Sequence, residues 1–276
     1  MRLLNGAQVI NHQQLHQKRN QSEQQDGHSR AETKYVYKEI FEDRIYFRHG
    51  IDLARGESVF DIGANIGLFT IFAKENFEGI KAYAFEPSPV IFPLLEANLA
   101  KYGNSALAYN CGLAKKRGEA TFTFYPGYSI MSGFHTERDQ DTKTLRAGIR
   151  SHLIDEGMTA AEIQDRFVNK MAEKALAQEQ RHVCELRTVS DILDQEDIGT
   201  VGLIKVDAEG SELDILAGIR SEHWQCIRQI VMEIHDPKET VCPLVKTVLD
   251  AQGFASVFEH EKRLSGAGIF NCYARR

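Results

Sequence analysis

The 276-residue sequence lacks the features that mark several large classes of protein. Its longest apolar runs, such as residues 66–73, fall far short of the ~20 residues that a membrane-spanning helix needs. The N-terminus has no apolar segment of the signal-peptide kind, because Asn5 and Gly6 directly follow Leu3 and Leu4. We therefore expect neither a membrane protein nor a secreted one.

Cysteine and positive charge are also scarce. The five cysteines are widely spaced and form no C-x-x-C pair, so neither a disulfide framework nor a structural zinc site is indicated. This usage predicts a protein of the reducing cytoplasm. Lys and Arg number 33 against 39 Asp and Glu, a net charge of −6, whereas a nucleic-acid-binding protein normally carries a basic excess. No nucleic-acid partner is predicted.

The length fits one large domain with appendages. Residues 8–33 are rich in Gln, His, Asn and Ser, and such a stretch buries too little apolar surface to offset the entropy lost on ordering. We therefore expect residues 1–33 to be a flexible leader or the remnant of an inter-domain linker. A single domain would then span residues 34–276, beginning with aromatic residues at helical spacing from Tyr35 to Phe41.

Strand-like and helix-like segments alternate from residue 58 onward. The pattern predicts strands at residues 58–61, 81–86, 105–109, 120–125, 201–207 and 227–234, the last being nearly continuous and apolar, as in a strand buried on both faces. Helical patterns follow the first, second and fifth of these strands. The alternation predicts an α/β fold with a doubly wound, mostly parallel sheet. Residues 254–258 and 269–273 would close the sheet as an antiparallel pair.

A polar segment without proline, residues 136–187, interrupts this alternation. Leu145, Ile149 and Leu153 are spaced by four, and Gly157 is placed to end a first helix. Thr159 and Glu162 have the spacing of a capping box before a second helix. We expect a helical insertion here. It is either a decoration with a solvated face or a lid over the carboxyl edge of the sheet, where ligands bind in this architecture.

A glycine-containing loop, Asp61-Ile62-Gly63-Ala64-Asn65-Ile66-Gly67, follows the first predicted strand. Glycines between a strand and a helix let the backbone approach a ligand, with NH groups facing it. Glu86 ends the next strand 19 residues after Gly67, where an acid suits the two hydroxyls of a ribose. The spacing therefore predicts a nucleoside ligand.

The same loop argues against a dinucleotide. It lacks the third glycine of G-x-G-x-x-G, and Asp61 at its start would repel a pyrophosphate but suits an ammonium group. S-adenosylmethionine carries a ribose and an ammonium group and no phosphate. We therefore predict S-adenosylmethionine as the cofactor and no nicotinamide cofactor.

Two polar clusters follow two of the late strands. Asp207 and Glu209 come after the strand at residues 201–207, and Glu233 and His235 end the strand that begins at residue 227. Because positions i and i+2 of a strand share a face, each pair is expected to point to one side at the carboxyl edge of the sheet. Packing alone does not explain an apolar strand that ends in Glu-x-His-Asp, so we expect these residues to carry chemistry.

Taken together, these segments resemble the FkbM-type family of S-adenosylmethionine-dependent O-methyltransferases. The family pattern is a D-x-G-A-N-x-G loop, an F-E-P after the second strand, a late K-x-D-x-E-G motif and an E-x-H strand end, and all four occur here in order. The resemblance is closer to the O-methyltransferase domains of polyketide and nonribosomal-peptide assembly lines. It rests there on residues 37–43, 48–51 and 131–133 and on the long helical insertion.

The resemblance implies a class I (Rossmann-like) methyltransferase fold, with the cofactor bound across the first two strands. Glu86 would bind the ribose hydroxyls, and residues 110–112 would border the adenine. The cofactor-binding residues implied in this way are Asp61, Gly63, Asn65, Gly67, Glu86, Pro87, Asn110 and Gly112. The catalytic pair that it implies is His235 with Glu209, and Asp207 would contact the cofactor ammonium or support that pair.

The chemistry of methyl transfer to an alcohol agrees with these roles. A neutral histidine near its reference pKa of about 6.5 suits concerted removal of the hydroxyl proton. A carboxylate on the other ring nitrogen would hold the tautomer and stabilise the imidazolium. The branch resemblance suggests a β-hydroxyl of an acyl chain tethered to an acyl carrier protein as the substrate.

Other functions remain open at this point. Asp207, Glu209, Glu233 and His235 are all donors that a divalent cation accepts, so metal-assisted methylation of a free polyol or sugar hydroxyl is one alternative. A second is a non-catalytic adenosylmethionine-binding module whose insertion is a docking surface. No dedicated metal site is predicted, and the oligomeric state cannot be inferred from the sequence.

Overall fold

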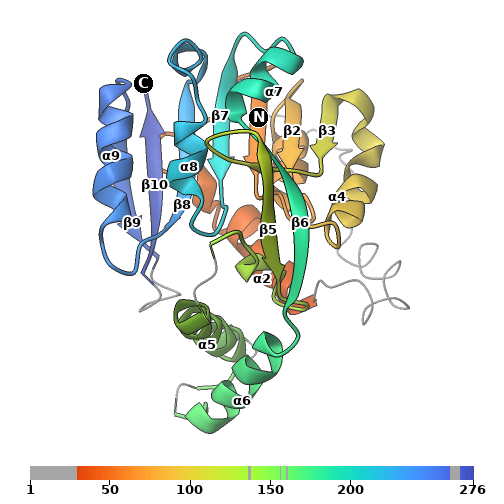
Figure 1. The fold of residues 1–276 in the computed structure, drawn as a ribbon, viewed down its shortest axis with the longest axis vertical. Coiled ribbons are helices and arrows are strands. Elements are labelled where there is room, and N and C mark those ends of the chain that lie inside the picture. Colours follow the sequence, from red (N-terminus) through yellow and green to blue (C-terminus); the bar gives the residue numbers. More distant parts are fainter. Residues whose placement is uncertain (1–29, 136–137, 156, 160, 262–267) are drawn as a thin grey trace, which may run out of the picture.

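The computed structural model describes residues 30–135, 138–155, 157–159, 161–261 and 268–276. Its centre is a seven-stranded sheet with the strand order β3-β2-β1-β7-β8-β10-β9 (Figure 1). Neighbouring strands are parallel except β10, which is antiparallel to β8 and β9. The predicted doubly wound sheet with an antiparallel closing pair is confirmed. The strands are β1 (Ser58–Ile62), β2 (Lys81–Phe85), β3 (Ala106–Tyr109), β7 (Val201–Val206), β8 (Gln229–His235), β9 (Ala255–His260) and β10 (Ile269–Arg275).

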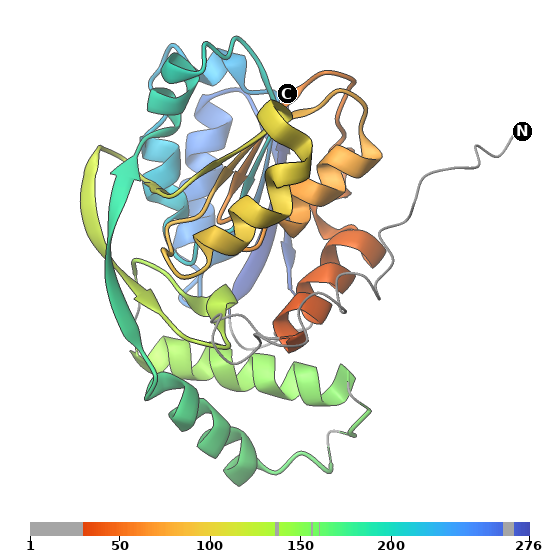
Figure 2. The same ribbon diagram turned by 90° about the vertical axis from the view of Figure 1, so that its right-hand side faces the viewer.

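Both faces of this sheet are covered (Figure 2). Because side chains alternate along a strand, Phe60 and Ile204 pack on one face with α7, α8 and α9, whereas Val59 and Leu203 pack on the other with α3 and the N-terminal segment. The helices are α3 (Leu68–Asn76), α4 (Phe92–Leu99), α7 (Val189–Gln195), α8 (Glu212–Ala217) and α9 (Val241–Ala251), with short turns η3 (Ala100–Ser105), η4 (Ser129–Met131) and η5 (Trp224–Cys226).

A second, three-stranded sheet lies beside the first, in the order β4-β6-β5. It consists of β4 (Gly112–Leu113), β5 (Gly118–Phe124) and β6 (Gln180–Arg187). The prediction of a helical insertion up to residue 187 is therefore wrong for its last eight residues. In β6, Cys184 is buried while Val183 is 71% exposed. With one buried side chain, the sequence of β6 does not show the alternation of apolar and polar residues that predicts a strand. Its partner strand β5 is also far away in the sequence.

The rest of the insertion forms the helices α5 (Arg138–Asp155) and α6 (Asp165–Leu176), called the lid helices below. Leu145 and Ile149 are buried in a small core that they share with α6, as their spacing predicts. Thr159 does donate to Glu162, but α6 starts only at Asp165, so this bond closes a turn ahead of the helix. In both views the lid helices lie together below the large sheet.

An N-terminal segment precedes β1: α2 (Arg30–Tyr37), a π-helical turn η1 (Lys38–Glu42) and a short helix η2 (Ile45–Phe47). The helical spacing predicted from Tyr35 to Phe41 is confirmed. Helix begins already at Arg30, inside the predicted leader of residues 1–33, and residues 1–29 lie outside the described part of the chain. No helix among the described residues has the length and apolar character needed to cross a bilayer.

Candidate active site

A pocket with about 890 Å³ of space that no atom fills, counting the part open to solvent, opens at the carboxyl ends of β1, β2 and β7. Its floor is the loop after β1, and one wall is formed by Glu86 and Pro87 after β2. Val36 and Ile40 of the N-terminal segment line it from another side, as does the loop of residues 129–134 between β5 and α5. These two covers are joined, since the backbone NH of Ile130 donates to Glu32 at 3.2 Å.

The backbone NH groups of the loop after β1 donate hydrogen bonds to other groups of the protein. Gly63 and Ala64 donate to the carbonyl of Phe85, Gly67 donates to Ala64, and Asn65 donates to the Glu86 carboxylate at 2.9 Å. The expectation that these NH groups face a ligand is therefore wrong. The loop has no free set of donors for a pyrophosphate, in agreement with the prediction against a dinucleotide.

Gly63 is required by the close approach of two strand ends. Its φ is +71°, and a Cβ there would lie 1.7 Å from the carbonyl oxygen of Asp207. No other residue fits without moving the end of β7. Gly63 therefore brings the two cofactor-side loops together, and its backbone lines the pocket.

Glu86 is buried in the pocket wall with its carboxylate held in place. Each oxygen accepts one backbone NH, from Asn65 at 2.9 Å and from Ser88 at 2.8 Å. Burial raises the pKa of Glu86 to about 7, although these two hydrogen bonds oppose the shift. The carboxylate has lone pairs left over, which suits the two hydroxyls of a ribose.

Two predicted cofactor residues lie behind the pocket wall. Gly67, with φ +87°, caps α3, and a Cβ there would approach Leu95 to 2.7 Å, so its role is to pack α3 against α4. The side chain of Asn110 donates to the backbone oxygens of Glu86 and Pro87 and thereby holds that loop. Neither residue lines the pocket, whereas Gly112 does.

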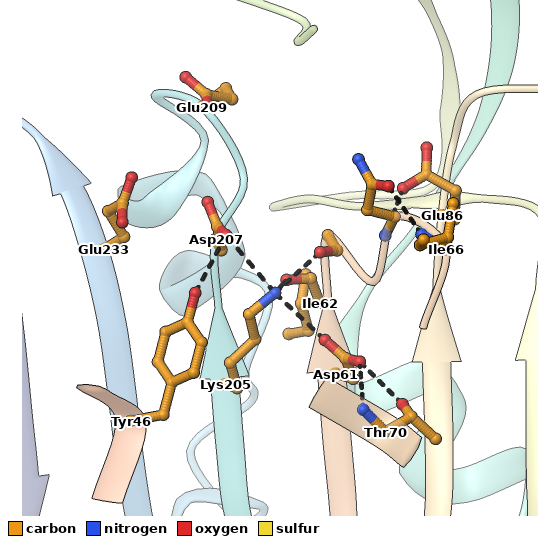
Figure 3. Close-up of polar contacts among 12 residues, drawn as sticks. Tyr46, Asp61, Ile62, Ile66, Thr70, Glu86, Lys205, Asp207, Glu209 and Glu233 are labelled. Atoms are coloured by element: carbon orange, nitrogen blue, oxygen red, sulfur yellow. Dashed lines mark hydrogen bonds and ion pairs between the residues drawn. The ribbon is translucent and has the colours of Figure 1, made fainter. Parts of the chain in front are cut away.

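Asp61 also lies behind the wall, where it is fully buried (Figure 3). One of its oxygens accepts the hydroxyl and NH of Thr70, and the other is 3.2 Å from the ammonium of Lys205. The implied direct contact between Asp61 and the cofactor is not present in this geometry. A buried carboxylate needs a cation and hydrogen bonds, and it finds them in β7 and α3 instead.

Lys205 links the buried Asp61 to the pocket (Figure 3). Its ammonium donates to the carbonyl of Gly63 at 2.8 Å and lies 3.7 Å from Asp207. Burial alone would lower the pKa of Lys205, but Asp61 and Asp207 outweigh it and raise the pKa, so the lysine stays charged. Tyr46 of η2 donates to the same oxygen of Asp207 at 3.2 Å, which aims that carboxylate along the pocket.

His235 sits between carboxylates at the end of β8. Its Nε2 lies 3.0 Å from Glu209 and 3.7 Å from Glu233, while its Nδ1 lies 3.3 Å from Glu212. Burial would lower the pKa of His235, but these three acids together raise it well above its usual value. The prediction of a neutral histidine with an ordinary pKa is therefore wrong for the unliganded protein.

Two of the carboxylates around His235 also have shifted pKa values. Burial raises the pKa of Glu209 and of Glu233 well above the usual range, with Asp207 adding to both shifts and His235 opposing them. Four acids, Asp207 among them, thus lie close to two basic side chains, His235 and Lys205.

Glu209 is held in an unusual backbone conformation. Its φ is +45°, in the left-handed region that costs a non-glycine residue energy and is found mainly where the surroundings enforce it. Gly133 provides the room, because a Cβ at that position would lie 2.9 Å from the Cβ of Glu209. The resulting position puts Glu209 in the wall of the cofactor pocket and of a second pocket.

The second pocket leads from Glu209 and His235 to the lid helices. It contains about 1540 Å³ of space that no atom fills, counting the part open to solvent. Its walls are the loop of residues 131–135, the loop between β8 and α9, and the first half of α5 at Lys143 and Thr144. The two pockets share Gly133, Phe134 and Glu209.

The four donors considered for a metal do not form a metal site. Within the described ranges, no three His, Cys, Asp or Glu side chains are arranged to hold a metal ion. Three of the four donors are engaged otherwise: Glu209 and Glu233 face His235, and Asp207 faces Lys205 and Tyr46.

Sequence reasoning did not assign roles to Lys205, Glu212, Tyr46 or Gly133. For Lys205 a signal existed, since it is the one charged residue in the otherwise apolar stretch of residues 201–206. For Glu212 and Tyr46 there was none, because their partners come from other elements. Gly133 belongs to a segment noted above only for its resemblance to the assembly-line branch.

Comparison with known proteins gives consistent matches. A family model described as the methyltransferase FkbM domain matches residues 61–256. The chain is 35% identical over 246 residues to the 31-O-demethyl-FK506 methyltransferase FkbM of Streptomyces tacrolimicus. The aligned region covers 89% of this chain and 91% of that protein. It is 34% identical over 250 residues to the AMB antimetabolite synthetase AmbE of Pseudomonas aeruginosa, covering 89% of this chain and 12% of the synthetase. Among solved structures, a precorrin-6y C5,15-methyltransferase of Geobacter metallireducens aligns with a TM-score of 0.41 and 9% identity over 82% of each chain.

Proposed function

The chain belongs to the FkbM methyltransferase family and is an S-adenosylmethionine-dependent methyltransferase, and on this premise we propose that it methylates an aliphatic hydroxyl in the biosynthesis of a natural product. The proposed substrate is the β-hydroxyl of an acyl chain on a carrier protein in the cytoplasm. The match to the 31-O-demethyl-FK506 methyltransferase supports transfer of the methyl group to oxygen. The match to part of the synthetase AmbE supports the assembly-line setting.

The observation that carries the proposal is the position of Glu209. It lines the cofactor pocket and the second pocket, and it contacts His235 at 3.0 Å. A hydroxyl bound in the second pocket beside this pair meets a proton acceptor and the cofactor pocket at the same point. Alignment of the attacking oxygen is what such a reaction needs most from an enzyme.

The cofactor pocket fits S-adenosylmethionine by its donor set. Glu86 offers a buried carboxylate to the ribose, Gly63 brings the backbone close, and the carboxylate of Asp207 suits a cationic ligand. When bound, S-adenosylmethionine supplies a methyl group on a positively charged sulfur. Val36 and Ile40 of the N-terminal segment add apolar side chains to the pocket lining.

We assign proton removal to Nε2 of His235. Glu212 is almost fully buried and bonds to Nδ1, so it holds the proton there and leaves Nε2 as the acceptor. Glu212 thus takes the orienting role expected above of Glu209. A substrate hydroxyl that displaces Glu209 from Nε2 removes one of the acids that raise the pKa of His235, which makes the imidazole a better proton acceptor at neutral pH.

The test is methylation of defined substrates, followed by mass spectrometry. Carrier protein loaded with a 3-hydroxyacyl chain should gain the mass of one CH2 unit, a methyl group in place of the hydroxyl hydrogen, when incubated with the enzyme and S-adenosylmethionine. His235→Gln should lower the rate by roughly 10²–10⁴-fold, the usual contribution of a general base, while calorimetry shows unchanged cofactor binding. His260→Gln, at an exposed position on β9, is the matched control and should keep wild-type activity.

Other outcomes point elsewhere. Full activity of His235→Gln on every hydroxyl substrate would remove the base assignment. Methylation of free sugars or polyols but not of the acyl substrate would contradict the proposal that the substrate is bound to a carrier protein. Cofactor binding without turnover on any alcohol would favour a non-catalytic binding module.

A further inference from the structure

The outer end of the second pocket lies between two separate elements. Lys143 comes from the lid helix α5, and Lys238 comes from the loop between β8 and α9. Both side chains are exposed, and both line the pocket whose inner end holds Glu209 and His235. The chain is acidic as a whole, with a net charge of −6, so two lysines at one pocket mouth stand out from the average surface.

The acids of this pocket do not neutralise the two lysines. Asp236 accepts the backbone NH groups of Thr240, Val241 and Cys242 at 2.6–2.8 Å, and so caps the start of α9. Glu209 contacts His235. Among the residues whose side chains the structure describes, no acid forms an ion pair with Lys143 or Lys238.

We propose that Lys143 and Lys238 form a binding site for a phosphate group carried by the substrate, and that this phosphate is the one at the head of a phosphopantetheine arm. The inference rests on the proposed function, because it takes the substrate to be tethered. An ammonium group is a compact point charge that binds phosphate well. A phosphate bound at the mouth leaves the acyl end of the arm to extend inward to His235.

The arrangement also explains why one lysine belongs to the lid. A phosphate bound by both side chains bridges α5 and the edge of the large sheet. Binding of the tethered substrate then brings the lid helices toward the site, and a substrate without the phosphate lacks this link. The site therefore selects for the carrier-borne form over the free alcohol.

The experiment compares two substrates that differ only in the phosphate. The full chain is given 3-hydroxyacyl pantetheine and 3-hydroxyacyl 4′-phosphopantetheine with S-adenosylmethionine. We expect kcat/KM for the phosphorylated substrate to be higher by about tenfold or more, since one charge-assisted contact is typically worth that factor. In the double variant Lys143→Gln/Lys238→Gln this preference, measured as the ratio of the two kcat/KM values, should disappear.

A matched control and a binding measurement complete the test. Lys170→Gln removes an exposed lysine of α6 that does not line the pocket, and it should keep the preference. Calorimetry with 4′-phosphopantetheine alone should show binding to the wild type that the double variant loses. This readout does not depend on turnover.

The possible failures are distinguishable. Equal use of both thioesters by the wild type, or a preference that survives in the double variant, overturns the phosphate site and leaves the proposed function standing. Methylation of neither thioester overturns the proposed substrate, whereas lysine-dependent calorimetric binding would still support the phosphate site. Lysine-dependent methylation of a small phosphorylated alcohol such as glycerol 3-phosphate, without use of the thioesters, overturns the pantetheine assignment.

Discussion

At the scale of single residues, the charges of the cofactor pocket depend on the buried Lys205. Its ammonium lies 3.2 Å from Asp61, which is in β1, and 3.7 Å from Asp207, which directly follows β7. Removing one member of a buried ion pair leaves the other without compensation, which costs more than the pair contributes. The lysine therefore holds together the ends of β1 and β7, the two strands that carry the cofactor loops.

We expect Lys205→Met to destabilise the protein by about 3–5 kcal/mol, because Asp61 then keeps only its bonds to Thr70. Urea unfolding measures the change. The double variant Lys205→Met/Asp61→Asn should recover most of the loss, since the fully buried charge of Asp61 is gone and the partly exposed Asp207 keeps the hydroxyl of Tyr46. A double variant as unstable as the single one would contradict this account.

Glu86 predicts a pH dependence of cofactor binding. Burial raises its pKa to about 7 in the unliganded protein, and the ribose hydroxyls donate best to the ionised carboxylate. As the pH falls below about 7, the carboxyl becomes protonated and a proton must be released on binding, so cofactor affinity should fall by up to about tenfold per pH unit. Calorimetry with S-adenosylhomocysteine between pH 5.5 and 8 measures this. Glu86→Gln should bind more weakly at pH 8 and show a flat profile, and a sloping one would assign the pH dependence to another group.

Glu212 predicts a second pH effect, on kcat/KM. The base form of His235 is required, so activity rises with pH through the raised pKa of this residue. Glu212→Gln keeps the shape but removes a negative charge beside the imidazolium, so the pKa of His235 falls and the rising limb shifts to lower pH, with a lower plateau. Glu222→Gln, at an exposed position, is the control. A limb that does not move would exclude Glu212 as the orienting residue.

At the scale of elements, the insertion has two parts with different roles. The lid helices pack in a small core that also includes Tyr125 and Met131 from the segment after β5, and they contribute Lys143 and Thr144 to the second pocket. Strand β6 instead pairs along the whole of β5 and covers Phe122 and Phe124, which belong to the core of the large sheet. Only the helices are expected to be separable from the fold.

Replacing residues 138–176 by a short Gly/Ser linker should therefore leave cofactor affinity within about threefold of the wild type, while turnover of the acyl substrate falls by on the order of 10² or more. Calorimetry and the mass-spectrometric assay measure the two effects. Replacing residues 138–187 removes β6 as well and should yield an unstable protein. Equal loss of cofactor affinity and turnover in the shorter replacement would give the helices a structural role only.

At the scale of the whole molecule, carboxylates from four segments converge on one edge of the sheet. The loops after β1, β2 and β7 and the end of β8 meet there because parallel strands bring their carboxyl ends to a common edge. The basic side chains of Lys205 and His235 lie among these acids. The described residues contain no group arranged to hold a metal ion.

If His235 is the base, methyl transfer should survive removal of divalent cations. We expect turnover in excess EDTA to stay within about twofold of the untreated enzyme, because the base and the cofactor suffice for the reaction. Loss of activity in EDTA that one divalent cation restores would instead favour metal-assisted methylation.

Much of the fold follows from local sequence pattern. Apolar runs such as residues 227–234 and the alternation from residue 58 predict the sheet, since burial on one or both faces repeats with a fixed period. The acids Glu86, Asp207 and Glu209 stand directly after strands, so their place at the carboxyl edge is also a local property. Strand β6 was missed because its pairing, and not its composition, makes it a strand.

The assignment of partners at the site was decided only by the tertiary structure. Asp61 pairs with Lys205, which is 144 positions away in the sequence, instead of lining the pocket. Nδ1 of His235, which was expected to contact Glu209, contacts Glu212 instead. Glu209 has a left-handed backbone conformation beside Gly133, and its side chain lies in the pocket wall. Sequence pattern shows which residues reach a common edge, since that depends on a repeat within each segment. Which of these residues contact one another depends on how distant segments pack together, and the sequence pattern of one segment carries no information about that packing.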